Sequence, residues 1–474
     1  MNVRRIGEVE WELAPAGRDD MRVPARVFAD EELLEAVRSD DSLEQLCNVA
    51  TLPGIVTAAL AMPDIHSGYG FPVGAVAATE LPDGVVSPGG VGYDINCGVR
   101  LLALPLTARE LGKRKEALVH EIARRVPTGT GRGGGLELDD AAFDAVLAEG
   151  PRALIGRGIG TPEDIERTES QGRLDDADPA RVSARARTRG AGQLGSLGSG
   201  NHFLELQRVG RILDAEAAAA FGLAEDQVTV LIHSGSRGLG HQVCTDFVKR
   251  MDAALARHGI TLPDRQLSCA PASSAEGRDY LRAMAAAANF AWANRHVMAH
   301  TIREAIAGVL GAETADATRQ VYDVAHNVAK REHHSGRDVL VHRKGATRAF
   351  PPGHPELPEA YRESGQPVFI PGSMGTASWV LAGRPGSMEH SFGTVCHGAG
   401  RRLSRTRARK QIGGAELRRQ LEDAGITVRG ASNKGLAEEA PFAYKAVERV
   451  VEVVERAGLA ARVAELRPIG VVKG

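Results

Sequence analysis

The chain has few aromatic side chains, and this limits the ways in which it could recognise nucleic acid. Phe, Trp and Tyr make up 4% of its 474 residues. Folds that stack several bases on a broad aromatic surface, such as the RRM and OB folds, need more of them. The net charge of −2 also argues against nonspecific coating of nucleic acid, because such binding depends on many Lys and Arg contacts to phosphate. Any contact with nucleic acid must therefore be local.

Cysteine and long apolar runs are also scarce. The five cysteines are Cys47, Cys97, Cys244, Cys269 and Cys396. Their odd number, wide spacing and lack of a CxxC pair exclude a disulfide framework and a zinc ribbon. No apolar run reaches the length of a membrane span, and the first residues, MNVRRIGEVEWEL, have no apolar segment typical of a signal peptide. We expect no membrane association and a reducing, cytoplasmic location, where a thiol can serve as a metal ligand.

Strand and helix patterns are mixed along the chain. Apolar runs predict strands at Val73–Thr79, Val99–Pro105, Val228–His233, Val321–Ala325, Val339–His342 and Val368–Pro371. Helical periodicity is clearest at Ala108–Arg125, Leu239–Arg257, Arg278–Leu310, Ala415–Ala424 and Ala443–Ala457. Because strands and helices do not alternate regularly, we expect an α+β fold with a large mixed sheet region, and not a doubly wound sheet.

The chain is expected to form one catalytic domain that spans residues 1–474. No Pro/Ser-rich linker divides it, and its distinctive motifs are spread from residue 62 to residue 473. Stretches rich in Gly, Arg and Asp within residues 129–192 predict a flexible or inserted surface lobe inside this domain.

Glycine is frequent and gathers beside polar residues. Clusters occur at residues 89–94, 195–200, 234–240 and 398–400. Glycine allows positive φ and lets the backbone approach a ligand closely, although any one cluster could be an ordinary turn. The second cluster fits GxxGxG and not GxGxxG, and no Gly-Lys-Ser/Thr follows it. A Walker-type or Rossmann-type nucleotide site is therefore disfavoured.

Five side chains form a candidate metal set: Asp94, Cys97, His202, His233 and His326. The three histidines lie at the ends of strand-like runs, where a rigid scaffold can deliver ligands. Taken singly, each histidine could be a hydrogen-bonded residue and the cysteine a small buried hydrophobe. Taken together, they favour a metal centre. Imidazole and thiolate suit Zn, Co or Ni, and an added carboxylate would accept Mn.

Seven motifs resemble the RtcB family of RNA ligases, in the family's order. They are MPDIHSGYGFP at 62–72, GYDINCGVR at 92–100, GNHFLE at 200–205, HSGSR at 233–237, AHNVA at 325–329, PGSMG at 371–375 and CHGAGR at 396–401. The resemblance covers nearly the whole chain.

The resemblance implies a role for each matched residue. Cys97 would bridge two Mn²⁺ ions, with Asp94 and His202 completing one site and His233 and His326 the other. His397 would attack the α-phosphate of GTP to form a histidine–GMP intermediate. The nucleotide would contact Asn201, Glu205, Ser373, Ser378, Gly398, Ala399, Gly400, Arg401, Tyr444 and Lys473. Residues 443–457 and 462–473 would form the end of the chain that covers the nucleotide.

The resemblance also implies the reaction. An RNA 3′-phosphate or 2′,3′-cyclic phosphate end would be joined to a 5′-hydroxyl end through an RNA–ppG intermediate, in RNA repair or tRNA splicing. The family suggests a monomer, and an archease-like activator protein is a candidate partner. The basic run after His397 places Arg405, Arg407 and Arg409 where RNA phosphates would arrive.

Two other classes stay open at this point. A dinuclear metallohydrolase would use the same Asp, Cys and His ligands but would need neither His397 nor GTP. A noncatalytic RNA-binding protein would need only the basic stretches, at residues 185–189 and 401–410, and either stretch could also be a plain solvated face. A protein–GMP adduct that is lost in His397→Ala would separate the ligase from both.

Overall fold

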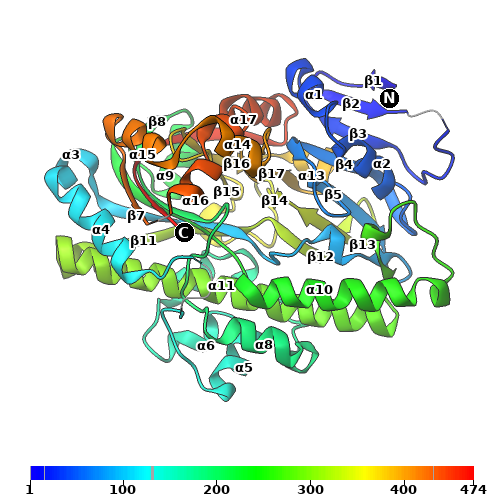
Figure 1. The fold of residues 1–474 in the computed structure, drawn as a ribbon, viewed down its shortest axis with the longest axis horizontal. Coiled ribbons are helices and arrows are strands. Elements are labelled where there is room, and N and C mark those ends of the chain that lie inside the picture. The colour runs from blue at the N-terminus through cyan, green and yellow to red at the C-terminus, as the bar shows by residue number, and fades with distance from the viewer. Residues whose placement is uncertain (1, 15–16, 130–132, 431) are drawn as a thin grey trace.

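Two large, mostly antiparallel sheets form the centre of the molecule (Figure 1). The computed structural model describes residues 2–14, 17–129, 133–430 and 432–474. The first sheet has the order β1 (Val3–Arg5), β2 (Glu10–Leu13), β3 (Ala25–Phe28), β4 (Ile55–His66), β5 (Val73–Glu80), β13 (Arg337–Lys344) and β12 (Asn327–His334). The second has the order β11 (Arg319–Ala325), β7 (Gly98–Thr107), β9 (Gln227–Ser234), β8 (Phe203–Ile212), β19 (Ala460–Lys473), β16 (Ser378–Gly383) and β15 (Pro367–Ile370), with β18 (Thr427–Gly430) parallel to β19.

Two short ribbons complete the strand pairing. The first pairs β10 (Ala270–Pro271) with β6 (Val85–Val86), and the second pairs β14 (Ala346–Arg348) with β17 (Thr394–Cys396). The mixture of sheets and helices, without a doubly wound core, confirms the expected α+β class.

Helices surround the two sheets. They are α1 (Glu31–Val37), α2 (Ser42–Val49), α3 (Ala108–Leu111), α4 (Lys115–Arg125), α5 (Asp140–Glu149), α6 (Arg152–Ile155), α7 (Pro162–Glu166), α8 (Ala184–Ala191), α9 (Ala215–Phe221), α10 (Arg237–Ala254), α11 (Ala275–Leu310), α12 (Ala312–Asp316), α13 (Pro385–Ser391), α14 (Arg405–Gln411), α15 (Gly414–Asp423), α16 (Asn433–Glu438) and α17 (Val447–Arg456). No helix in the described ranges is both long enough and apolar enough to span a bilayer.

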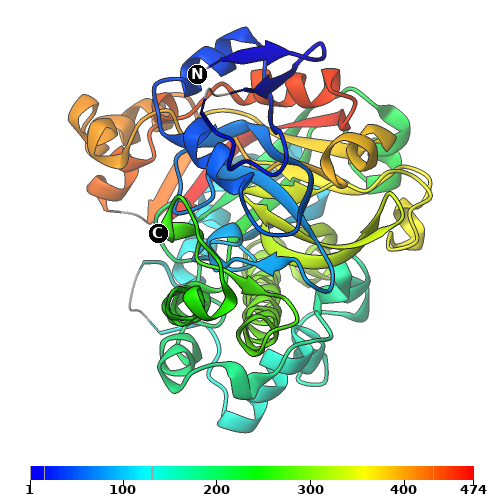
Figure 2. The same ribbon diagram turned by 90° about the vertical axis from the view of Figure 1, so that its right-hand side faces the viewer.

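The longest helix, α11, supports the second sheet from below. It runs beside α10, and Figure 2 shows the two helices nearly end-on. Alanines fill much of its centre, from Ala283 to Ala299, and all of those alanines are buried. Small side chains let neighbouring elements approach the helix closely, so α11 can bring polar residues such as Arg295 under the strand ends.

Residues 139–191 form a helical layer on the far side of α10 and α11 (Figure 1). In this layer α8 packs against α10, and α5 packs against α11. Residues 130–132, in the first Gly-rich stretch expected to be a surface connection, lie outside the described residues.

Three of the expected elements differ from the structure by more than a few residues at their ends. The helix expected at 108–125 is broken into α3 and α4 at Gly112, whose φ of +49° is outside the helical range. The last helix begins at Val447 and not at residue 443. Residues 462–473, expected to be a tail, belong to β19, which is an interior strand between β8 and β16. Their expected role in covering the nucleotide stays a prediction.

Candidate active site

The candidate metal ligands meet at one edge of the second sheet. Neighbouring strands there are antiparallel, so the start of one strand lies beside the end of the next. Cys97 directly precedes β7, His233 is near the end of β9, His202 precedes β8 and His326 follows β11. The pairing of Phe203 with His233 and of Gly98 with Ser234 fixes this alignment. The sheet register therefore brings residues that are far apart in sequence to one place.

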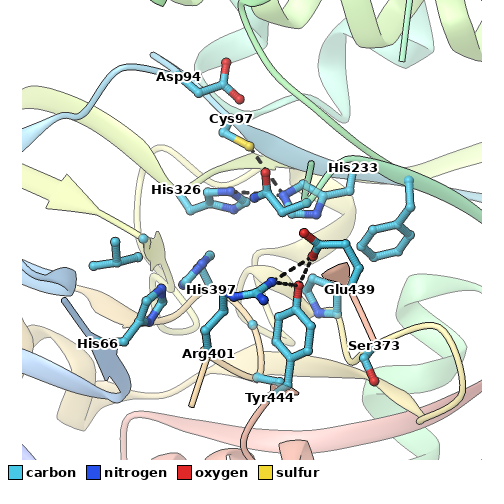
Figure 3. A pocket seen from close by; sticks show the side chains of 18 of the residues that line it. His66, Asp94, Cys97, His233, His326, Ser373, His397, Arg401, Glu439 and Tyr444 are labelled. Atoms are coloured by element: carbon cyan, nitrogen blue, oxygen red, sulfur yellow. Dashed lines mark hydrogen bonds and ion pairs between the residues drawn. The ribbon is translucent and has the colours of Figure 1, made fainter. Parts of the chain in front are cut away.

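Their ligand atoms form two groups that share Cys97. Figure 3 shows Asp94, Cys97, His233 and His326 of these groups. The Cys97 Sγ is 3.4 Å from His202 Nε2 and 3.4 Å from His233 Nε2. The His233 and His326 Nε2 atoms are 3.3 Å apart, and His202 Nε2 is 2.7 Å from Asp94 Oδ2. Within each group, Asp94–Cys97–His202 and Cys97–His233–His326, the ligand atoms lie within 4.8 Å of one another.

The electrostatics of these groups suit bound cations. Burial lowers the pKa values of His233 and His326 well below the usual range, so both imidazoles are neutral and have a free lone pair. Burial and the nearby Asp94 carboxylate raise the pKa of the Cys97 thiol well above its usual value. A thiolate at this position therefore needs compensating positive charge, which a divalent metal supplies. The donor set fits a pair of divalent metals.

His397 lies beside this cluster, at the end of β17. Its Nδ1 is 2.6 Å from Asp64 Oδ2, and the backbone N–H groups of His397 and Gly398 donate to the same oxygen over 3.0 and 3.3 Å. Burial alone would raise the pKa of Asp64, but the charge and hydrogen bonds of His397 outweigh it and hold that pKa below its usual value. An ionised carboxylate only accepts hydrogen bonds, so Nδ1 carries a proton, and in the neutral ring the lone pair is on Nε2.

A cavity of about 270 Å³ joins the metal cluster to His397. The ring centroids of His326 and His397 are 5.0 Å apart. The predicted residues that line the cavity are Asp94, Cys97, Asn201, His233, His326, Ser373, His397, Gly398, Ala399, Gly400, Arg401, Arg405, Tyr444 and Lys473. In the described part of the chain, the predicted residues outside this lining are His202, Glu205, Ser378, Arg407 and Arg409.

Glu205 and Ser378 lie just behind the cavity wall. The Gln207 side-chain amide donates to both, over 2.7 and 3.1 Å. Burial raises the pKa of Glu205 to about 8. Its Oε1 atom has no hydrogen-bond partner among the residues that the structure describes. A buried carboxyl oxygen without a partner is costly, so a hydrogen bond from a ligand would stabilise it.

Lys473 reaches the cavity because β19 pairs with β8. Lys473 lies opposite Phe203 in this pairing. Its ammonium donates to the carbonyl groups of Gly200 and His202 over 2.5 and 3.1 Å, and burial lowers its pKa to about 8. A residue that looks like part of a loose tail in the sequence is thus fixed in the sheet beside Asn201.

A family model described as "tRNA-splicing ligase RtcB" matches residues 45–474. The chain belongs to the RtcB family. The proteins named tRNA-splicing ligase RtcB from Thermococcus kodakarensis and Archaeoglobus fulgidus are 52% and 50% identical to it, and each comparison covers 100% of this chain and 99% of the relative. The RNA-splicing ligase RtcB of Mycobacterium tuberculosis is 52% identical over 437 residues, covering 91% of this chain and 100% of the relative.

Membership of the RtcB family confirms the resemblance seen in the seven motifs, and it confirms that the chain is an enzyme of the ligase class. The roles of single residues, the nucleotide and the metal remain predictions. The structure brings most of the predicted site residues into one cavity, and it sets Arg407 and Arg409 apart on the exposed surface of α14.

Several site residues were missed by the analysis of the sequence. Asp64 lies inside the MPDIHSGYGFP motif, so the motif could have indicated a role for this residue. No pattern in the sequence links Asp64 to His397. Lys445 was missed too. Its ammonium donates to the carbonyl groups of Pro63 and Ile65 and so holds the strand on either side of Asp64.

Glu439 is a third missed residue, and it organises the basic side of the cavity. Its carboxylate accepts from Arg401 Nη1 at 3.0 Å, from Arg405 Nε at 3.1 Å and from the Tyr444 hydroxyl. Burial would raise the pKa of Glu439, but the cations of Lys473 and Arg401 outweigh it and lower that pKa. One carboxylate therefore holds two arginines and a tyrosine together at the cavity wall.

Arg295 of α11 supports the metal cluster from below. Its guanidinium donates to the carbonyl groups of Asn96 and Ser234 over 2.8 and 2.9 Å, and it pairs with Asp323 at 2.7 Å. Arg100 pairs with the same carboxylate at 2.7 Å, and all three charged side chains are fully buried. Asn96 and Ser234 are the neighbours of Cys97 and His233, so one side chain ties two ligand-bearing strands together.

Proposed function

We propose that this RtcB-family chain is a GTP- and Mn²⁺-dependent RNA ligase that joins 3′-phosphate or 2′,3′-cyclic phosphate ends to 5′-hydroxyl ends. The observation that carries the proposal is the Asp64–His397 pair. In the neutral ring this pairing puts the lone pair on His397 Nε2, and His397 lines the same cavity as the Cys97-centred ligand groups. The names of the relatives, tRNA-splicing and RNA-splicing ligase, support RNA as the substrate.

Two Mn²⁺ ions are the proposed resident metals. Asp94, Cys97 and His202 would hold one, and Cys97, His233 and His326 would hold the other. When bound, divalent ions neutralise phosphate oxygens and the negative charge that develops on them during transfer. The thiol, the imidazoles and the carboxylate are all acceptable to Mn²⁺, although their affinity order alone does not select it.

His397 performs the first step of the proposed reaction. Its Nε2 attacks the α-phosphorus of GTP, so an N–P bond forms, the bond to the bridging oxygen breaks and pyrophosphate leaves. The Asp64 carboxylate stabilises the positive charge that develops on the imidazole and holds the ring in this orientation. The carboxyl group of Glu205, whose Oε1 has no partner among the described residues, would form a hydrogen bond with the guanine base, and Arg401 would lie beside phosphate.

Two further transfers complete the sealing. An oxygen of the RNA 3′-phosphate attacks the phosphorus of the histidine–GMP, and His397 leaves with its lone pair restored. The 5′-hydroxyl of the second strand then attacks the RNA phosphorus of the RNA–ppG end, loses its proton and expels GMP. A 2′,3′-cyclic end would first be hydrolysed to the 3′-phosphate.

The proposal is tested by ligation of two labelled RNA strands. Full-length protein is incubated with a 3′-phosphate strand and a 5′-hydroxyl strand, with each nucleotide and each divalent metal in turn. We expect a sealed product with GTP and Mn²⁺, and none from a 3′-hydroxyl strand. His397→Ala should abolish sealing, whereas the matched variant His333→Ala, at an exposed position of β12, should retain it.

Two results would contradict the ligase. Sealing that is unchanged in His397→Ala would remove the proposed nucleophile. Opening of cyclic ends in the presence of metal, with no sealed product under any nucleotide, would instead favour the dinuclear metallohydrolase.

A further inference from the structure

Three aromatic rings form a cluster at the metal end of the cavity. The Tyr93 ring stacks on His241, with centroids 4.7 Å apart and an angle of 28° between the planes. Tyr69 meets Tyr93 edge-on at 5.3 Å. Tyr93 lines the cavity and directly precedes the candidate ligand Asp94. We call Tyr69, Tyr93 and His241 the aromatic platform.

The rings of the platform are accessible to solvent. The chain has six tyrosines, so the exposure of each can be compared. Three of them, Tyr280, Tyr322 and Tyr361, are fully buried. Tyr69 and Tyr93 are partly exposed, and so is Tyr444 at the other end of the cavity, while His241 is exposed. The tyrosines that this chain leaves accessible therefore all lie at or beside the candidate active site. Rings in such a position can stack on a ligand with a planar face.

Hydrogen bonds fix the backbone around Tyr69 while its ring stays accessible. The Gln45 side chain exchanges two hydrogen bonds with Gly68, at 2.7 and 3.0 Å, and the Gly70 N–H donates to Gln266 at 3.0 Å. The ammonium of the buried Lys344 donates to the carbonyl of Tyr69. A binding surface that is held in place before its ligand arrives loses less entropy on binding.

Positive charge lies next to the platform. Arg189 of α8 donates to Gln242, which follows His241 on α10, over 3.0 Å. Arg189 belongs to the basic stretch at residues 185–189, which the sequence left open between a nucleic-acid contact and a solvated face. A strand whose base stacks on Tyr93 would have its phosphates within the field of this arginine.

The two ends of the cavity suit different ligands. Figure 3 shows Asp94 at one end and Tyr444 and Ser373 at the other, with His233, His326 and His397 between them. The proposed guanosine site is at the Tyr444 end, so the platform at the Asp94 end is left for the second substrate.

We propose that the aromatic platform stacks a nucleobase of the RNA strand, at the nucleotide that carries the reacting end. This inference rests on the proposed RNA ligase function and adds a subsite to it. Stacking on an aromatic face depends little on which base is present, so the subsite would hold RNA ends of any sequence. It would place the terminal phosphate or hydroxyl toward the ligand cluster at Asp94 and Cys97.

The test measures RNA use by enzyme that already carries GMP, so that any effect on the first step is excluded. Single-turnover sealing is followed over a series of RNA concentrations for the wild type, Tyr69→Leu, Tyr93→Leu and His241→Leu. We expect the half-saturating RNA concentration to rise about 5- to 100-fold in Tyr93→Leu, the range for loss of one base–aromatic stack. Tyr93→Phe keeps the ring and should restore binding to within about twofold of the wild type.

An abasic nucleotide separates stacking from a general disturbance of the site. An RNA with this abasic nucleotide should bind the wild type more weakly than the intact RNA does. In Tyr93→Leu the abasic nucleotide should lower the RNA affinity little further, because the stack is already absent. The matched control is His354→Leu, in which the replaced histidine also stacks on an aromatic ring, Phe350, at 3.7 Å, but lies outside the cavity lining within the described residues. This control should bind RNA like the wild type.

A fluorescent base, 2-aminopurine, identifies the strand. It is placed at the last nucleotide of the 3′-phosphate strand in one arm and at the first nucleotide of the 5′-hydroxyl strand in the other. Quenching in one arm that is lost in Tyr93→Leu assigns the platform to that strand. Equal RNA binding by the wild type and all three leucine variants, with unchanged quenching in both arms, would overturn the platform. A wild type that seals no RNA would instead contradict the proposed function.

Discussion

At the scale of single residues, the Asp64–His397 pair is the most sharply defined feature of the site. Asp64→Asn replaces a carboxylate that accepts hydrogen bonds by an amide that can also donate one, so His397 no longer has to keep its proton on Nδ1. We expect the rate of histidine guanylylation to fall about 100-fold or more, as when a catalytic histidine loses its orienting carboxylate. Rapid quenching of reactions with labelled GTP measures this rate.

The matched control for that variant is Asp338→Asn, because Asp338 also pairs with a histidine, His333, but on an exposed part of the sheet. It should guanylylate like the wild type. A rate for Asp64→Asn within twofold of the wild type would show that the carboxylate does not orient the nucleophile.

Glu205 gives the chain a pH dependence with a definite sign. Burial raises its pKa from 4.5 to about 8, so the folded state binds this proton more tightly than the unfolded state does. The contribution of Glu205 to stability therefore falls as the pH rises from about 4.5 to about 8, and stays constant above that range. In Glu205→Gln this loss disappears.

We expect the melting temperature of Glu205→Gln, relative to the wild type, to increase steadily between pH 5 and pH 8 and then to level off. Thermal unfolding of metal-free and nucleotide-free protein across a pH series measures the difference. Two melting curves that stay parallel over this range would mean that Glu205 is ionised in the folded protein.

At the scale of elements, the sheet edge formed by β7, β8, β9 and β11 explains why the ligands converge. Because Cys97 belongs to both ligand groups, Cys97→Ala should weaken the binding of both metal ions. We expect the Mn²⁺ content after dialysis to fall from two ions per chain to fewer than one, while Cys244→Ala, which removes another buried thiol, keeps two. Elemental analysis measures the content. Retention of two ions by Cys97→Ala would exclude a bridging thiolate.

The support of this edge by α11 leads to another prediction. Arg295→Met removes the bonds to Asn96 and Ser234 and leaves Asp323 paired with Arg100 alone. We expect metal affinity to fall about 10- to 100-fold, the usual effect of losing a partner that orients metal ligands. Titration with Co²⁺, followed by the thiolate-to-cobalt absorption, measures affinity independently of catalysis. Arg282→Met, which removes an exposed guanidinium from the same helix, should bind Co²⁺ like the wild type.

Apolar strands bounded by turns were the elements that could be predicted best. The run expected at Val228–His233 is β9, within one residue at each end, because its side chains are apolar and it ends in a Ser-Gly turn. The last strand, β19, was missed. It contains Arg462, Glu465, Arg467 and Pro468, which look like a loop in the sequence. In the sheet Glu465 pairs across the strands with Arg211 at 2.5 Å and along its own strand with Arg467 at 2.9 Å, so neighbouring side chains satisfy these charges.

At the scale of the whole molecule, the site depends on contacts between distant parts of the chain. Histidines at strand ends could be recognised from the sequence, because each follows or precedes an apolar run. Asp64 and Glu439 could not be recognised from the sequence, because only the folded structure brings them to their functional partners. Asp64, for example, contacts a histidine 333 positions away. Sequence spacing carries no information on such a contact, whereas strand pairing and the position of β17 beside β14 fix it.

The central claim is that His397 is the nucleophile of a guanylylated enzyme. The most direct measurement is mass spectrometry of the full-length protein after incubation with GTP and Mn²⁺, followed by mapping of the modified peptide. The account predicts one added GMP per chain, bound to His397 and absent when GTP is replaced by a nonhydrolysable analogue blocked between the α- and β-phosphates. A GMP bound to another residue, or a wild-type protein that seals RNA without carrying any GMP, would contradict it.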